Sequence, residues 1–233
     1  MRRIYSFIII FSLCFQSLWS EVNEYIPLKD LYADHFLVGN ILAGGIDGNS
    51  LFRQDKEELA LLIGEFNCLT AENSMKMQYV QPEEGVFNFK SSDALLHIAD
   101  EAGMEVVGHA LVWHHQVPHW IFKDSEGNPV SRKVLIQRMK DHIFEVVGRY
   151  KGKIKYWDVV NEALNDDGSL RKTVFLDMLG ENYIEQAFSL ANNLSDLNFN
   201  SSWFSLTYSP SEIFISSISS IKGDFIILSA PGF

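Results

Sequence analysis

Three clusters of polar side chains in this sequence have the composition of a binding or catalytic site. One of them, Trp157-Asp158-Val159-Val160-Asn161-Glu162, places an amide and a carboxylic acid directly after an apolar run. A carboxyl group among aromatic side chains is disfavoured in its charged form, which suits it to protonating a leaving group. Glu162 is therefore the candidate general acid/base. The alternative, that Glu162 caps the following turn, stays open.

The second cluster, Glu72, Asn73 and Lys76, brings an acid, an amide and an ammonium group within one turn of chain. Such a set can hold neighbouring hydroxyl groups of a sugar through several hydrogen bonds. A salt bridge between Glu72 and Lys76 is the alternative that involves no ligand.

The third cluster is the histidine-rich and tryptophan-rich stretch at residues 108–120. Trp113 or Trp120 could supply the apolar face on which a pyranose ring stacks. The histidines at 109, 114, 115 and 119 raise the question of a metal, but their spacing matches no ligand motif such as HExxH. The sequence therefore predicts neither a metal site nor a cofactor.

The elements around these clusters follow a regular alternation. From residue 35, short apolar runs alternate with amphipathic stretches of helical period, a pattern typical of parallel strands joined by crossover helices. The expected strands are residues 35–43, 66–72, 105–112 and 155–160, and the expected helices are 54–65, 91–102, 131–150 and 170–190. The second helix should begin on a Ser91-Ser92-Asp93 cap and end at Gly103. Each polar cluster falls at the C-terminal end of a strand, the face on which (β/α)8 barrels build their active sites.

The stretch from about Phe66 to Ala191 closely resembles the family 10 glycoside hydrolases, the endo-β-1,4-xylanases. The resemblance is carried by FNCLTAENSMK at residues 66–76, PEEGVFNF at 82–89, GHALVWHHQVPHW at 108–120 and WDVVNEAL at 157–164. The weaker segment HFLVGNILAGG at 35–45 fits the first strand of the family. The resemblance implies an α/β fold made of about the first four βα units of a (β/α)8 barrel, over residues 35–191, with a C-terminal tail that does not match.

The resemblance also implies roles for single residues, with xylan or xylo-oligosaccharides as the partner. Glu162 matches the general acid/base, and Asn161 matches the amide that contacts the sugar at the cleavage point. The side chains that hold the next sugar on the non-reducing side match Glu72, Asn73 and Lys76. Residues lining the cleavage site match His109, Trp113 and Gln116, and a supporting pair beneath it matches His114 and Asp158.

Two departures from the family pattern stand out. The family usually has tryptophan directly after the lysine, where this chain has Met77. Retaining glycosidases also use a second carboxylate about 5–5.5 Å from the first as nucleophile, and in the family it lies in a Thr-Glu-Leu-Asp-like strand end of the second half. The later glutamates, Glu181, Glu185 and Glu212, stand in no such motif. Since such a barrel takes about 250 residues or more, the chain is expected to be truncated before its nucleophile.

Composition and charge limit the remaining possibilities. The chain has 233 residues, of which 47% are hydrophobic and 21% charged, a range typical of globular proteins and not of disordered or collagen-like ones. Its formal net charge of −11 argues against a nucleic-acid partner. Cys68 stands in an apolar run and is expected to be a buried small hydrophobe.

The two ends of the sequence differ in character from the middle. Met1-Arg2-Arg3 precedes the apolar run Ile4–Phe15, which predicts a secretory signal peptide at 1–20 and a secreted protein, extracellular or periplasmic. The run is shorter than the roughly 20 residues of a spanning helix, so no membrane association is expected after its removal. Residues 21–191 are then the partial catalytic domain. Residues 192–233 form a tail rich in serine, isoleucine and phenylalanine. Its composition favours a segment foreign to the fold, such as one read out of frame, although it also allows one or two further strands.

Three functions remain in competition. The chain is expected to represent an exported retaining endo-xylanase, a fragment that binds xylo-oligosaccharides without cleaving them, or a truncated product with no function.

Overall fold

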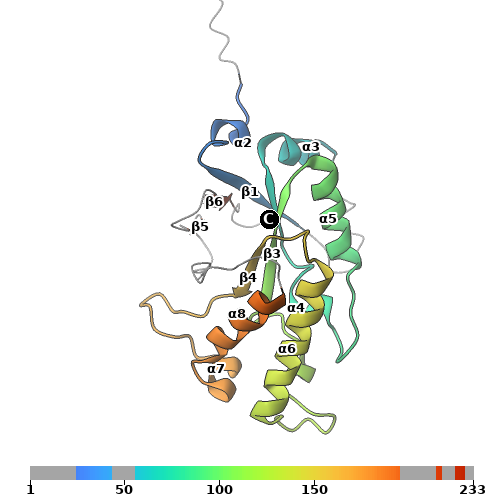
Figure 1. Cartoon of the computed structure of the whole chain (residues 1–233), viewed down its shortest axis with the longest axis vertical. Helices are drawn as coiled ribbons and strands as arrows, with labels where there is room; N and C mark the ends of the chain where they lie inside the picture. Colours follow the sequence, from blue (N-terminus) through green and yellow to red (C-terminus); the bar gives the residue numbers. More distant parts are fainter. Residues whose placement is uncertain (1–24, 44–55, 195–213, 217–223, 229–233) are drawn as a thin grey trace, which may run out of the picture.

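The structure is a computed structural model that describes residues 25–43, 56–194, 214–216 and 224–228. The predicted signal peptide and much of the predicted tail lie outside these residues. Six strands in the described part form one sheet, in the order β4-β3-β2-β1-β6-β5 (Figure 1). The strands are β1 (Phe36–Leu42), β2 (Cys68–Ala71), β3 (Glu105–Val112), β4 (Tyr156–Val160), β5 (Phe214–Ser216) and β6 (Asp224–Leu228). None of the helices described is long and apolar enough to cross a bilayer.

Strands β1 to β4 are parallel and adjacent in chain order, as the sequence pattern predicts. The partners Gly39↔Cys68, Cys68↔Glu105 and Val107↔Tyr156 set the register across the four strands. The larger helices between and after them are α3 (Lys56–Glu65), α5 (Lys90–Ala102), α6 (Arg132–Arg149) and α8 (Tyr183–Leu194). Helix α5 packs against β2 and β3, α6 packs against β3, and α8 packs against β4. This arrangement is that of the first four βα units of a (β/α)8 barrel.

The core lies between these helices and the sheet. Helix α6 contributes the fully buried side chains of Leu135, Met139 and Ile143, which recur on one helical face. Cys68 is also buried, as predicted, and its burial raises the pKa of the thiol to about 12.

Strands β3 and β4 approach each other most closely at Gly108. This residue pairs with Trp157 across the strands, and a Cβ placed on it would lie 2.2 Å from Cε3 of the tryptophan ring. Only glycine leaves room for the indole there. The sequence pattern gave no indication of this contact, because the two residues are far apart along the chain.

Helix α5 confirms one predicted end and corrects the other. It ends at Gly103, which has φ 65° and the left-handed conformation expected of a C-terminal glycine. Its N-terminus lies at Lys90 with Phe89 before it, so the predicted serine cap is wrong. The buried Ser92 hydroxyl instead donates to the carbonyl of Ser74, 2.8 Å away, which ties the helix to the loop that follows β2.

The predicted helix at residues 170–190 is also wrong in its extent. The structure has a short α7 (Val174–Leu179) and a separate α8, with Gly180 between them at φ 70°. Thr173 caps α7 by accepting from the backbone N–H of Leu176 at 3.1 Å. Three short helices were not predicted: α2 (Leu28–Leu31), α4 (Met77–Val80) and the 3₁₀ turn η2 (His119–Ile121).

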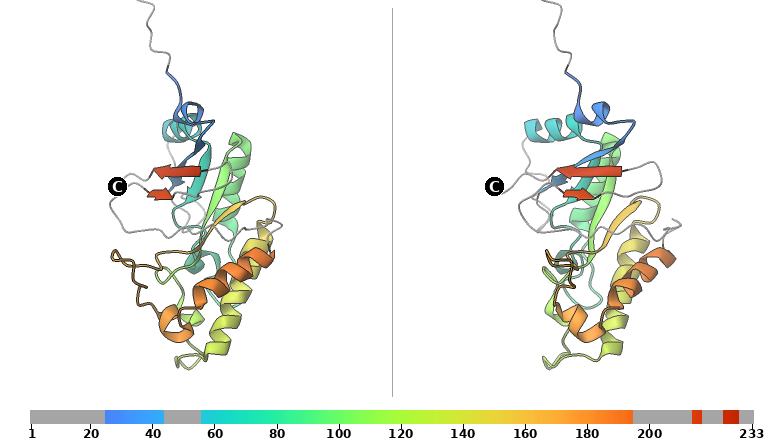
Figure 2. Two further views of the ribbon diagram at one scale, coloured as in Figure 1. Left: turned by 60° about the vertical axis from the view of Figure 1, so that its left-hand side comes forward. Right: turned by 90° about the vertical axis from the view of Figure 1, so that its left-hand side faces the viewer.

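Of the described tail residues, 192–194 complete α8, and 214–216 and 224–228 belong to the sheet. Strand β6 pairs with β1 in parallel from Phe36↔Asp224 to Asn40↔Leu228, and β5 pairs with β6 in antiparallel fashion. Figure 2 shows this pair of strands in red beside the blue β1. A first strand leaves a row of backbone groups without partners at its edge, and a segment of high β propensity can supply them. Of the alternatives that the tail composition allowed, the structure has the further strands.

Candidate active site

The three polar clusters meet at the end of the sheet where β1 to β4 terminate. Glu72 follows β2 directly, and its backbone N–H donates to the carbonyl of Leu42, the last residue of β1, at 3.2 Å. Asn161 follows β4, and its N–H donates to Val112, the last residue of β3, at 2.9 Å. Backbone hydrogen bonds therefore hold the loop starts against neighbouring strands. Parallel strands carry their C-terminal ends to one edge, and the predicted site residues lie at this edge except for His109 and Asp158, which are within β3 and β4.

His109 and Asp158 form a pair across β3 and β4. They are register partners, and His109 Nδ1 lies 2.8 Å from Asp158 Oδ2. The Asp158 side chain is buried, and its Oδ1 has no hydrogen-bond partner among the described groups. Because the carboxylate only accepts, Nδ1 of the imidazole donates, and the ring is held with Nε2 free for a further contact. Asp158, which the family resemblance implies to be a supporting residue, thus contacts His109.

Glu162 lies beside His114. Its Oε2 is 3.9 Å from His114 Nε2, and both side chains are partly exposed. Arg171 donates from Nε to the backbone carbonyl of Glu162 at 3.1 Å, and from Nη2 to Leu164. These contacts fix the main chain at Glu162 and leave its carboxyl group open to solvent on one side.

Glu162 and Gln116 both have positive φ angles, 52° and 44°. Side chains other than glycine seldom adopt this region, which costs about 1–3 kcal/mol and is often found at functional sites. In the structure the main chain at Gln116 is held by a hydrogen bond from the N–H of Gln78 to its carbonyl, 2.9 Å long. Both strained residues belong to the predicted site, which supports a role for their positions.

A network of short contacts joins the second and third clusters. Asn73 Oδ1 accepts from Lys76 Nζ at 3.2 Å and from Gln116 Nε2 at 3.0 Å. Gln116 Nε2 also lies 3.2 Å from the Tyr79 hydroxyl. Lys76 Nζ stands 4.8 Å from the centre of the Trp113 ring, within the range of a cation–π interaction. The Lys76 ammonium group, the amides of Asn73 and Gln116, and the Trp113 indole therefore lie together and form one continuous group.

The site also alters the ionisation of two groups. Burial lowers the pKa of Lys76, while the carboxylates of Glu72 and Glu162 act in the opposite direction. Burial likewise lowers the pKa of His114, to which the neighbouring His115 and Arg171 contribute, against the effect of Glu162. Lys76 thus interacts electrostatically with Glu72 of the second cluster and with Glu162 of the first.

The two candidate stacking residues have different surroundings. The Trp113 ring lies among the imidazoles of His109, His114 and His115, at centroid distances of 5.3–6.3 Å, and its Nε1 is buried without a described partner. Trp120 is fixed by Arg138, whose guanidinium lies 5.5 Å from the ring. The Trp120 Nε1 donates to the carbonyl of Gln81 at 3.2 Å. Trp113 is the better placed of the two to face a ligand.

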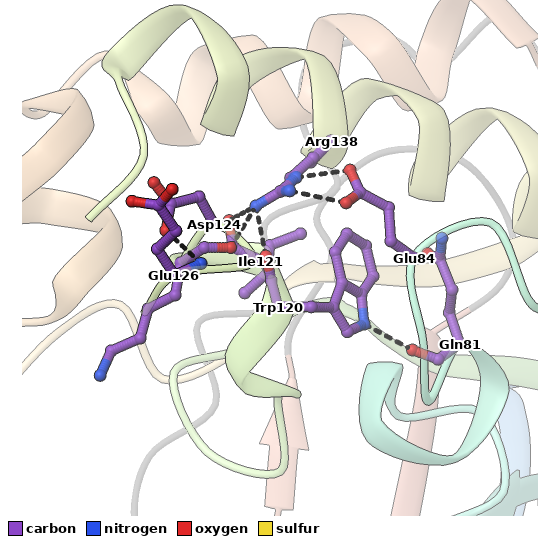
Figure 3. A network of polar contacts seen from close by, with 8 residues as sticks. Gln81, Glu84, Trp120, Ile121, Asp124, Glu126 and Arg138 are labelled. Atoms are coloured by element: carbon purple, nitrogen blue, oxygen red, sulfur yellow. Dashed lines mark hydrogen bonds and ion pairs between the residues drawn. The ribbon is translucent and has the colours of Figure 1, made fainter. Parts of the chain in front are cut away.

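Figure 3 shows how Arg138 anchors the loop after β3. Its guanidinium binds both carboxylate oxygens of Glu84 at 2.6 Å, and it donates to the backbone carbonyls of Trp120 and Lys123. The loop that carries the histidines and Trp120 is therefore fastened to α6 and to the segment after α4.

Sequence reasoning did not single out Tyr79 and Arg171. Each acts on a predicted residue, Tyr79 on the Gln116 amide and Arg171 on the Glu162 main chain. Tyr79 lies three residues from Lys76 in a short helix that no pattern predicted. Arg171 stands in a loop with no motif of its own, and only the fold brings it to Glu162.

Comparisons with known proteins agree on one family. The sequence model described as "Glycosyl hydrolase family 10" matches residues 27–205. Endo-1,4-beta-xylanase A of Xylanibacter ruminicola is 42% identical over 165 residues, covering 71% of this chain and 44% of the relative. Endo-1,4-beta-xylanase B of Paenibacillus barcinonensis is 46% identical over 172 residues, covering 73% and 49%.

Solved structures give the same result. The crystal structure of xylanase XynB from Paenibacillus barcinonensis, complexed with a conduramine derivative, is 40% identical with a TM-score of 0.65. The match covers 74% of this chain and 50% of that one. The chain spans about half the length of the relatives it matches. With a family model over most of its length and the strand order described above, the chain belongs to glycosyl hydrolase family 10.

Proposed function

We propose that this chain provides the acid/base half of a retaining endo-1,4-β-xylanase that acts on xylan. The observation that carries the proposal is the position of Glu162 at the end of β4. It lies beside His114 and within Coulombic range of Lys76, which in turn contacts Asn73 and Trp113. A carboxylic acid next to a polar and aromatic surface is the arrangement that a glycosidase needs for protonating a sugar oxygen.

In this mechanism Glu162 protonates the glycosidic oxygen as the bond to the anomeric carbon breaks. The second carboxylate attacks that carbon and forms a covalent glycosyl-enzyme, and Glu162, now ionised, takes a proton from water in the second step. His109, held by Asp158, offers Nε2 to the sugar near the cleavage point. Asn73 and Lys76, together with Glu72, supply hydroxyl contacts on the non-reducing side.

The nucleophile of this reaction is not recognisable in the sequence. Glu181 lies two residues before α8, Glu185 lies in its first turn, and Glu212 lies outside the described residues. Turnover thus requires a second carboxylate from a segment with the missing motif. The proposal also includes export through the predicted signal peptide at 1–20, which the apolar run and its two arginines support.

A chimera tests the role of Glu162. Residues 25–191 are joined to the second half of the Paenibacillus barcinonensis xylanase, and release of reducing sugar from xylan is measured with and without Glu162→Gln. Loss of the acid is expected to lower the rate by 10²–10⁴-fold, the contribution typical of general acid–base catalysis. An aryl xyloside whose leaving group needs no proton should lose far less in the glycosylation step. Equal xylan hydrolysis by the chimera and its variant would rule out the assignment.

Binding without turnover is the second candidate, and a specific observation favours it for the chain alone. Three contacts link the site side chains in the described part: Asn73 with Lys76, Asn73 with Gln116, and Lys76 with Trp113. The later glutamates stand in no nucleophile motif. Calorimetry with xylotetraose should then show binding by the full chain, weakened in Asn73→Ala, and no release of reducing sugar. Absence of heat with a chain that melts cooperatively would exclude this function.

A further inference from the structure

Two adjacent histidines and the proposed acid/base form a compact group of ligand atoms. His114, His115 and Glu162 each place a nitrogen or oxygen so that all three atoms lie within 4.8 Å of one another. The His114 and His115 rings are 4.2 Å apart between centroids, and His114 Nε2 is 3.9 Å from Glu162 Oε2. We propose that these three side chains bind a divalent transition-metal ion within the candidate active site.

The geometry suits such an ion after small side-chain movements. Ligand atoms around a tetrahedral zinc ion, with bonds of about 2.0–2.1 Å, are separated by about 3.3 Å. The spread of up to 4.8 Å in the structure therefore requires a contraction of about 1.5 Å at most. Rotations about the χ angles of His115, which is exposed, and of Glu162 can supply it.

The donor set selects the class of ion. Two imidazole nitrogens and one carboxylate oxygen suit zinc, copper and nickel, whereas magnesium and calcium prefer sites made wholly of oxygen. His114 and His115 can each bind a metal through a ring nitrogen that carries no proton. Three protein ligands leave a further position open to water.

The surroundings limit the strength of the site. Arg171 and Lys76 both lie within Coulombic range of its members. Their positive charges oppose the approach of a cation, and two of the three ligands are in adjacent positions of a loop. The site is therefore weaker than a structural zinc site, with affinity falling in the order copper, zinc, magnesium.

Metal at this site has a chemical consequence that rests on the proposed function. A carboxylate oxygen of Glu162 that binds a metal cannot carry the proton for a leaving sugar oxygen. The ion is expected to inhibit hydrolysis reversibly, and a chelator restores it. Only reversible coordination bonds to the metal form, with no change of oxidation state, so the effect needs no further reactant.

The test measures metal binding directly, without sugar. The full chain, free of affinity tags, competes with a chromophoric chelator for Zn²⁺, with Cu²⁺ and Mg²⁺ as comparisons. The exposed His115→Ser change is expected to weaken Zn²⁺ binding by at least about tenfold, and Glu162→Gln should weaken it similarly. The matched control is His97→Ser, since His97 pairs with Glu101 at 3.6 Å on an exposed face of α5.

Thermal melting provides a second readout. Zn²⁺ should raise the melting temperature of the unchanged chain and of His97→Ser, but not that of His115→Ser, since an ion that binds only the folded state stabilises it. Zn²⁺ affinity that is unchanged in His115→Ser, or reduced equally in His97→Ser, would overturn the proposal. These outcomes are independent of the xylan chimera, so failure of the metal site and failure of the acid/base assignment are distinguishable.

Discussion

The imidazole of His109 and the carboxylate of Asp158 stand side by side on β3 and β4, with Nδ1 2.8 Å from Oδ2. The pair joins the two strands that carry the third and first polar clusters. The buried Asp158 carboxylate also holds the ring of His109, a residue of the candidate active site, in place. The same hydrogen bond therefore positions the His109 ring and is expected to stabilise the folded protein.

A double-mutant cycle on this pair should reveal the coupling. His109→Ala, Asp158→Ala and the combined variant are compared by urea unfolding. We expect a coupling free energy of about 1.5–3 kcal/mol, the range for hydrogen bonds to a charged group. Additive costs would show that the contact contributes nothing to stability.

Gly108→Ala is expected to destabilise the protein, because the new methyl group would meet Cε3 of Trp157 at 2.2 Å. Overpacking of this kind costs about 1–3 kcal/mol in the free energy of unfolding. Gly148→Ala on α6 is the matched control, since a Cβ there meets nothing within 4 Å, and it should stabilise by about 0.4–1 kcal/mol. Denaturant midpoints measure both. A smaller cost of Gly108→Ala in a Trp157→Val background would confirm that the indole is the obstacle.

Arg138→Met should unfold at clearly lower denaturant than the unchanged chain. The substitution removes the donor of the partly buried Trp120 carbonyl, at a cost of about 1–3 kcal/mol, whereas the exposed Lys123 carbonyl can bind water instead. Glu84→Gln removes only the ion pair, whose carboxylate is largely exposed, and should cost under about 1 kcal/mol. Equal losses of unfolding free energy in the two variants would contradict the prediction that Arg138 stabilises the protein mainly through the backbone carbonyl and not through the ion pair.

His142 gives the protein a specific sensitivity to acid. Burial lowers the pKa of its ring to about 3, and Nδ1 lies 2.9 Å from Gln81 Oε1. The unfolded chain takes up this proton near pH 6.5, whereas the folded chain stays neutral. The contribution of His142 to stability is therefore complete above pH 6.5 and is lost by about 1.4 kcal/mol per pH unit as the pH falls toward 3.

The measurement is the unfolding free energy between pH 7 and pH 5 for the unchanged chain and His142→Gln. The variant should lose less stability on acidification, whatever its stability at pH 7. His97→Gln, on an exposed helix face, serves as control and should keep the original slope. An unchanged slope in His142→Gln would show that the buried ring does not control the acid response.

Much of the fold followed from patterns that act over a few residues. Residues 105–112 form a strand as predicted, and Gly103 caps α5, because a short, mostly apolar run and a left-handed terminal residue are local properties. The split between α7 and α8 was missed, because Gly180 interrupts an apolar period that otherwise continues across it.

In the candidate site, too, some features could be predicted from the sequence and others could not. Its residue types and their places after strands were readable from the sequence, and the family motifs implied their roles. The sequence by itself thus determined the βα order, the family and the groups available for chemistry.

The tertiary structure alone decided which groups touch. It paired Asp158 with His109, set Glu162 beside His114, brought Arg171 to the Glu162 main chain and placed β6 against β1. Arg171 and Glu162 lie in one loop, which the bridge between Leu164 and Leu170 folds back on itself. The other contacts join residues from separate loops and strands, and they depend on strand register and on the path of the backbone. The spacing of residues along one segment does not reveal the strand register, because the register is set only when distant segments pack together.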